Sequence, residues 1–131
     1  MKVLVVADHP DASEIICALL GILGHEAREA ISGTEAVAVA AVFEPELVIL
    51  DIGLPDLSGY EVARELRSRY PDRCIHIAAV TGWAQVNDRV RSLAAGIDQH
   101  FLKPVGAETI VAIVAAAEDS RIKFQARATE G

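Results

Sequence analysis

Residues 47–55 read LVILDIGLP, a short apolar run that ends in an aspartate and is followed by glycine and proline. Continuous rather than alternating hydrophobicity is typical of a strand that is buried on both faces, as in a parallel sheet. Similar runs, rich in β-branched residues, occupy 3–7 and 75–80, and a weaker run occupies 99–102. Residues 26–30 are a fifth candidate, inferred mostly from their place between two helical segments. We therefore expect a parallel sheet of five strands.

Helical periodicity separates the strands. Apolar residues recur at helix spacing in five segments, and the first four segments end at a glycine or ahead of a proline. These stops are Gly24, Pro45, Pro71 and Gly96. The apolar series occupy 15–23, 36–41, 62–66, 86–94 and 110–117. Strand alternating with helix five times predicts an α/β domain whose sheet is covered by helices on both faces.

Composition narrows the classes of function. The chain has 131 residues, 52% of them hydrophobic, which suits one domain with a core that needs neither metal nor disulfide. Its 12 Lys and Arg against 19 Asp and Glu give a net charge of −7, which disfavours binding to nucleic acid or to an anionic membrane. Cys17 and Cys74 fit neither a disulfide framework nor a zinc site. We expect a soluble, cytoplasmic protein without a signal peptide or a transmembrane helix.

A polar side chain ends four of the strands. Asp8 ends the first strand, Asp51 the third, Thr81 the fourth and Lys103 the fifth. Ligands of open parallel sheets bind beyond the carboxyl ends of the strands, so we expect these side chains to converge on one pocket. Taken singly, Asp8 would suit a helix cap, Thr81 a turn and Lys103 a surface position. Their occurrence at four strand ends favours a shared site.

Two acids, a hydroxyl and an amine suit phosphoryl transfer. Neighbouring carboxylates repel unless a cation lies between them, and Mg²⁺ takes oxygen ligands from carboxylates, water and phosphate. One carboxylate oxygen then remains to attack phosphorus. Lys103 can neutralise the phosphoryl oxygens, and Thr81 can donate a hydrogen bond to one of them. We therefore predict phosphoryl transfer to an aspartate, with Asp51 as the central candidate.

Four stretches, in order and at matched spacing, resemble the receiver domain of two-component response regulators. They read VLVVADHP (3–10), LVILDIGLPDLSGYE (47–61), AVTGW (79–83) and AGIDQHFLKP (95–104). The resemblance covers residues 2–117, and residues 118–131 form a polar tail that either extends the last helix or frays. It implies a flavodoxin-like (βα)5 three-layer sandwich whose five parallel strands have the order 2-1-3-4-5.

The resemblance also implies how the site works. A phosphohistidine on a histidine kinase or a histidine phosphotransfer protein donates its phosphoryl group to Asp51. Asp8, Asp51 and the backbone carbonyl of Gly53 bind Mg²⁺, and Lys103 contacts the phosphoryl group. The Lys103–Pro104 peptide bond is expected to be cis. The aspartyl phosphate then hydrolyses, partly through the domain itself, so the domain catalyses its own phosphorylation and slow dephosphorylation and is otherwise no enzyme.

A switch is implied by the same resemblance. Thr81 moves to hydrogen-bond the phosphoryl group, and His100 takes the place of the family's aromatic switch residue. The domain is expected to be a monomer or a weak dimer through its fourth helix, fifth strand and fifth helix. It either stands alone or belongs to a hybrid histidine kinase, and its downstream partner is not specified by the sequence.

One departure from the family concerns the metal. The family usually has two adjacent acids after the first strand, and here Ala7 replaces the first of them. The loss of one carboxylate predicts weaker Mg²⁺ binding, although we expect the site to work because Asp8 and the other site residues are present. We interpret Asp11 as the N-cap of the following helix rather than as a replacement ligand.

Three other functions remain open at this point. Ala7 leaves room for a degenerate receiver, a protein-interaction module that acts without phosphorylation. A metal-dependent phosphatase with Asp51 as its nucleophile would want a second acid where the chain has Gly53. A flavodoxin would want a loop rich in Ser, Thr and Gly after the first strand, where the chain has DHPD (8–11).

Overall fold

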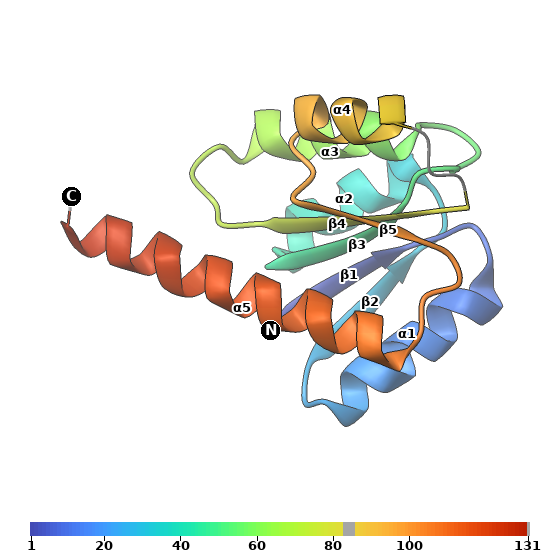
Figure 1. Cartoon of the computed structure of the whole chain (residues 1–131), viewed down its shortest axis with the longest axis horizontal. Helices are drawn as coiled ribbons and strands as arrows, with labels where there is room; N and C mark the ends of the chain where they lie inside the picture. Colours follow the sequence, from blue (N-terminus) through green and yellow to red (C-terminus); the bar gives the residue numbers. More distant parts are fainter. Residues whose placement is uncertain (83–85, 131) are drawn as a thin grey trace.

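The computed structural model describes residues 1–82 and 86–130, and within these ranges five helices surround one five-stranded sheet (Figure 1). The strands are β1 Lys2–Val6, β2 Glu26–Ala30, β3 Leu47–Asp51, β4 His76–Thr81 and β5 Gln99–Leu102. The helices are α1 Pro10–Ile22, α2 Gly33–Phe43, α3 Gly59–Arg69, α4 Val86–Ala95 and α5 Ala107–Glu130. All neighbouring strands are parallel, in the order β2-β1-β3-β4-β5, which confirms the predicted flavodoxin-like sandwich.

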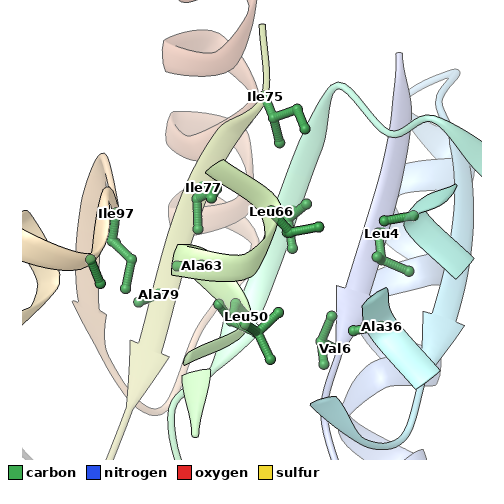
Figure 2. Packing of buried hydrophobic residues seen from close by; sticks show 14 of the residues in the cluster. Leu4, Val6, Ala36, Leu50, Ala63, Leu66, Ile75, Ile77, Ala79 and Ile97 are labelled. Atoms are coloured by element: carbon green, nitrogen blue, oxygen red, sulfur yellow. The ribbon is translucent and has the colours of Figure 1, made fainter. Parts of the chain in front are cut away.

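The sheet has a hydrophobic core on each face. Helices α1 and α5 cover one face, and α2, α3 and α4 cover the other (Figure 1). In β1, Val3 and Val5 point into the core under α1 and α5, whereas Leu4 and Val6 point into the core under the other three helices (Figure 2). Both sets are almost completely buried. This two-sided burial explains why the strand sequences are continuously apolar.

The start of α1 differs from the prediction. β1 ends at Val6 rather than at Asp8, and the helix begins at Pro10 with His9 as its N-cap. Proline is favoured at the first helical position because its φ is already helical and its missing N–H is not needed there. The interpretation of Asp11 as the N-cap was therefore wrong. Asp11 lies in the first turn, where its charge suits the helix dipole.

The predicted helix stops are confirmed. α1 is followed by Gly24 and α4 by Gly96, both with positive φ, and α2 and α3 end ahead of the two prolines. α5 includes residues 118–130, so the polar tail continues the last helix. Arg121 Nε pairs with Glu46 Oε2 at 2.6 Å and ties this part of α5 to the start of β3. Within the described ranges, no helix combines the length and the apolar content needed to cross a lipid bilayer.

Both cysteines are free thiols. Burial raises the pKa of the Cys17 thiol to about 11, and burial also raises the pKa of Cys74. The thiolate is the reactive form of cysteine, and it is scarce near neutral pH when the pKa is raised in this way. Cys17 and Cys74 are therefore packing residues rather than reactive thiols.

Close backbone packing fixes the loop after β3. The N–H of Gly59 donates to the carbonyl of Ile52 at 3.0 Å, so the start of α3 folds back onto the end of β3. A Cβ at position 59 would lie 2.8 Å from the Ile52 Cα and 2.9 Å from the Asp51 carbonyl oxygen. These neighbours are backbone atoms and cannot swing aside, so the position requires glycine.

We expect Gly59→Ala to lower the free energy of unfolding by about 1–3 kcal/mol, because its methyl group would overpack the backbone of the loop. Gly21→Ala is the matched control. Gly21 lies inside α1, and nothing lies within 4 Å of an added Cβ there. Alanine should stabilise that position by about 0.5–1 kcal/mol. Urea unfolding of both variants measures the effects, and equal effects of the two substitutions would contradict this account of Gly59.

Candidate functional site

The strand register brings together the side chains predicted at the ends of β3, β4 and β5. Asp51 lies opposite Val80, and Thr81 lies opposite Leu102, which immediately precedes Lys103. The backbone N–H of Lys103 donates to the carbonyl of Thr81 at 2.8 Å, so the chain leaves β5 beside β4. Thr81 is buried at this edge of the sheet. Three residues that are far apart in the sequence therefore end neighbouring strands.

The Asp51 carboxylate is buried and held at both oxygens. The residue is 8% exposed. Lys103 Nζ lies 2.6 Å from Oδ2, and the backbone N–H of Gly53 donates to Oδ1 at 3.0 Å. A buried carboxylate is costly unless a charge and hydrogen bonds compensate it, and this pair supplies both. The Lys103–Pro104 peptide bond is cis, as predicted.

Asp8 lies at the same edge of the sheet. Val6 is paired with Leu50, so the chain leaves β1 directly beside Asp51 and reaches Asp8 two residues after Val6. The Asp8 side chain is partly exposed, and its Oδ1 lies 3.8 Å from Nε2 of the solvent-exposed His9. This contact is long for an ion pair. The carboxylate therefore remains available to a cation from solvent.

The oxygen donors of this site fit a hard divalent cation. Mg²⁺ usually takes one or two carboxylates, and water or phosphate oxygens fill its other positions. Asp8 and Asp51 supply two carboxylates, and Gly53 follows Asp51 closely enough to offer its carbonyl. Among the residues that the structure describes, His, Cys, Asp and Glu side chains form no group of three or more that could hold a metal ion. Ala7 explains the small ligand set, because it occupies the position of the first of the family's two adjacent acids.

A cavity of about 720 Å³ opens beside Asp51 and Lys103. Its walls are mostly apolar and come from the end of β1, the first turns of α1 and the segment after β5, including Ala7, Ile15 and Val105. Ile15 is 70% exposed at the rim. No pattern in the sequence predicts this cavity. Ala7 is the one residue that hints at it, because an acid there would make the wall polar.

His100 lies in the edge strand β5 and is tied to α4. Its Nδ1 lies 2.8 Å from the hydroxyl of Ser92, which is buried. Ser92 had no signal in the sequence, because a serine in an amphipathic helix usually faces solvent. Trp83, which closes one of the family motifs, lies outside the described residues.

Asp56 ties the loop after Asp51 to the start of α2. Its carboxylate accepts hydrogen bonds from the backbone N–H groups of Gly33 at 2.8 Å and Thr34 at 2.9 Å, and from the hydroxyl of Thr34. These bonds, the hydroxyl bond first among them, hold the pKa of Asp56 well below its usual range. Asp56 therefore acts as a remote cap for α2 and steadies the loop that contains Gly53.

Comparison with known proteins identifies the family of this chain. The chain matches the family model of the response regulator receiver domain over residues 3–115. It is 37% identical over 111 residues to the probable transcriptional regulatory protein TcrX of Mycobacterium tuberculosis, and 36% identical over 115 residues to the transcriptional regulatory protein KdpE of that species. The two alignments cover 85% and 88% of this chain but 47% and 50% of the relatives. The chain thus spans about half the length of the curated relatives it matches.

Solved structures agree as well. A CheY-like response regulator receiver domain protein from Methanospirillum hungatei is 27% identical, with a TM-score of 0.80 over 99% of this chain and 98% of that chain. The signal receiver domain of a putative Luxo repressor protein from Vibrio parahaemolyticus is 21% identical and has a TM-score of 0.86 over 95% of both chains. The second likeness concerns the fold alone.

The Asp56 cap predicts a pH dependence of stability. A carboxyl group whose pKa is lowered by folding stabilises the folded state above its unfolded pKa of about 3.9 and loses that effect as the pH falls further. We therefore expect Asp56→Asn to lower the Tm at pH 7, and the difference from the wild type to shrink as the pH falls below about 4. Thermal unfolding at a series of pH values measures this. A difference that is constant with pH would contradict it.

Proposed function

Because this chain belongs to the response regulator receiver domain family, we propose that it accepts a phosphoryl group on Asp51 from a phosphohistidine of a histidine kinase or a histidine phosphotransfer protein. The family predicted from the sequence is confirmed. The observation that carries the proposal is the contact of 2.6 Å between Lys103 Nζ and a buried Asp51 that borders an open cavity. Such a pair orients a nucleophile and places a cation where negative charge gathers during transfer.

The transfer exchanges one bond to phosphorus for another. A carboxylate oxygen of Asp51 attacks phosphorus, the new O–P bond forms, and the bond from phosphorus to the histidine nitrogen breaks. The released imidazole keeps the electron pair and takes a proton from solvent. The Lys103 amine moves from Oδ2 to a phosphoryl oxygen, while the Gly53 N–H keeps the acyl oxygen in place.

Asp8, Asp51 and the Gly53 carbonyl are the residues that would bind Mg²⁺ in this proposal. When bound, the ion neutralises charge between the carboxylates and the phosphoryl oxygens. Asp8 follows Ala7, where the family usually has another acid. We therefore expect the affinity for Mg²⁺ to be lower than in receivers with both acids. Slow hydrolysis of the aspartyl phosphate would return the domain to its starting state.

The switch would act through the end of β4. Thr81 lies one residue beyond the partner of Asp51 in the register, so a phosphoryl group on Asp51 falls within reach of its hydroxyl. A turn of Thr81 changes the space at the edge of the sheet next to β5. His100 would then leave Ser92, and α4 would lose the bond of 2.8 Å that ties it to β5. The exposed face of α4, β5 and α5 is the surface that would respond, either to a partner or to a second copy.

The apolar cavity suits the phosphodonor protein. Phosphohistidine must approach Asp51 from the open side, past the rim that Ile15 and Val105 form. An apolar side chain of the donor that enters the cavity beside its histidine would exclude water and fix the approach. This assigns recognition of the donor to α1 and to the segment after β5.

We infer that phosphorylation of this receiver controls a regulatory output. The curated relatives are named as transcriptional regulators, which supports a regulatory output for the protein in which this receiver acts. The net charge of −7 makes direct contact between the receiver itself and nucleic acid unfavourable. We place the receiver in the cytoplasm, where histidine kinases expose their phosphorylated domains.

Acetyl phosphate tests the central claim. Incubated with Mg²⁺ and this donor, the protein should gain the mass of one phosphoryl group, about 80 Da. Asp51→Asn should abolish the gain, because an amide oxygen does not form the acyl phosphate. Intact-mass spectrometry measures both. A wild type that stays unlabelled would instead support the degenerate receiver, and steady hydrolysis of phosphate esters would support a phosphatase.

The variant Ala7→Asp distinguishes a site that binds Mg²⁺ weakly from a degenerate site that is not phosphorylated. A second carboxylate beside Asp8 should tighten Mg²⁺ binding by roughly tenfold, since about 1–2 kcal/mol of Coulomb energy is available at such distances. At low Mg²⁺, labelling of this variant should exceed that of the wild type. If the wild type binds Mg²⁺ no more tightly than tens of millimolar and Ala7→Asp fails to label, the Mg²⁺ ligands have been assigned wrongly.

Ile15→Lys tests recognition of the donor. We expect phosphotransfer from a histidine donor protein to slow by roughly 10- to 100-fold, because an apolar contact worth about 1.5–3 kcal/mol is lost. Labelling by acetyl phosphate should stay within about twofold, since the small donor needs no docking surface. Ile22→Lys is the control, since Ile22 is 82% exposed at the opposite end of α1. Equal effects of the two lysines on phosphotransfer would place the docking surface elsewhere.

A further inference from the structure

We propose that a second site, a basic cleft between the C-terminal half of α5 and the amino end of β4, binds a small organic phosphate. The cleft has a volume of about 520 Å³ and is called the α5 cleft below. It lies at the end of β4 opposite Thr81, so it is separate from the Asp51 site, and the proposal does not depend on phosphorylation. The lining residues that carry the argument are Arg67, Arg73, Leu93, Lys123, Phe124 and Arg127.

The α5 cleft concentrates positive charge in an acidic protein. Four of the chain's 12 Lys and Arg line it, although the net charge is −7. One carboxylate, that of Asp98, is present among the lining residues that the structure describes. Asp98 Oδ2 already accepts hydrogen bonds from Arg67 Nη2 and from the backbone N–H of Ile77, both at 2.8 Å. Arg73 and Lys123 pair with carboxylates outside the lining, Glu44 and Asp119, so the lining itself has an excess of cations and favours an anion.

Three of these cations have donors to offer. Arg73 binds Glu44 through Nη2 at 3.0 Å, but its Nη1 is buried and has no hydrogen-bond partner among the described residues. Lys123 pairs with Asp119 at 3.0 Å on the solvent side of α5, and because such exposed pairs are weak, the amine can turn toward a ligand. Arg127 lies one turn beyond Lys123 and can grip phosphate oxygens with its guanidinium fork.

The α5 cleft also has an apolar part. Phe124 is 41% exposed between Lys123 and Arg127, and Leu93 of α4 is exposed across the cleft. The buried side chain of Ile97 lies in the same wall. An exposed aromatic ring beside cations suits a ligand that carries a flat apolar group next to its phosphate. This is why we infer an organic phosphate rather than a free inorganic ion.

The helix that presents these residues is anchored just before them. Ser120 Oγ lies 3.1 Å from Nδ1 of the buried His76, and His76 Nε2 lies 2.8 Å from Oε1 of Gln99. The ion pair between Arg121 and Glu46 adds a second tie. The wall that carries Lys123 and Phe124 is thereby held against the sheet, so the cleft exists before a ligand arrives and binding need not order it.

Titration of the whole chain with ADP, pyrophosphate and adenosine tests the proposal. The titrations are followed by amide chemical shifts in buffer without Mg²⁺. We expect ADP to bind best, pyrophosphate more weakly and adenosine not measurably. The shifts should appear at Cys74, Ile97 and Ser120 rather than at Asp51 and Lys103. Shifts confined to the Asp51 site, or equal binding of adenosine and ADP, would overturn the proposal.

Charge-reversal variants then test the assigned residues. Lys123→Glu and Arg127→Glu should each weaken ADP by at least about tenfold, a change of 1.4 kcal/mol. Arg64→Glu, an equal charge change at an exposed position of α3 outside the cleft, should leave binding unchanged. Phe124→Ala should weaken ADP but not pyrophosphate. An equal loss with Arg64→Glu, or binding of an acidic peptide in place of ADP, would refute a small-molecule site.

Discussion

A buried carboxylate at the edge of the sheet sets the conditions that the rest of the structure meets. Asp51 is 8% exposed, and a charge in that position is tolerated because Lys103 Nζ and the Gly53 N–H bind its two oxygens. Lys103 reaches Asp51 only if β5 lies next to β4 and ends at Leu102, the partner of Thr81, so that Lys103 is the next residue. The Gly53 N–H reaches Asp51 only if the loop after β3 folds back so that Gly59 packs against Ile52. The parallel register and the tight loop are thus both requirements of one ion pair.

The sequence predicted the parts of the fold that depend on burial. The central strands are apolar on both faces, and the helix stops rest on backbone conformations that glycine allows and proline enforces. β2 was harder to predict from the sequence, because it is an edge strand. Ala30 is buried in it, whereas the charged residues of EAREA are exposed. Its pairing with β1, rather than its composition, makes it a strand. The start of α1 was misjudged because Pro10 outweighed the cap that Asp11 suggested.

The site, like the fold, has a part that the sequence predicts and a part that it does not. Side chains at strand ends could be predicted, because the topology of a parallel sheet gathers them whatever the loops do. Contacts between helices, loops and strands could not be predicted, because no sequence pattern relates the two segments that meet. Ser92 is buried against His100, whereas Ile15, which helical spacing marks as a core residue, is 70% exposed. Periodicity identifies an apolar face but not how far the neighbouring element covers it. Ile15 and the segment after β5 line the cavity beside Asp51 from different elements, and no sequence pattern specifies the space between them.

Helix α4 contacts both the proposed switch residue His100 and the α5 cleft. Ser92 of α4 binds His100, and the next residue, Leu93, forms part of the wall of the α5 cleft. Packed interiors transmit displacement rather than absorb it, so a movement of α4 that frees His100 also changes the shape of the cleft. Binding free energies are reciprocal. A ligand that fits the cleft better in one position of α4 must therefore shift the equilibrium at His100 by the same free energy with which the switch alters the affinity of the cleft.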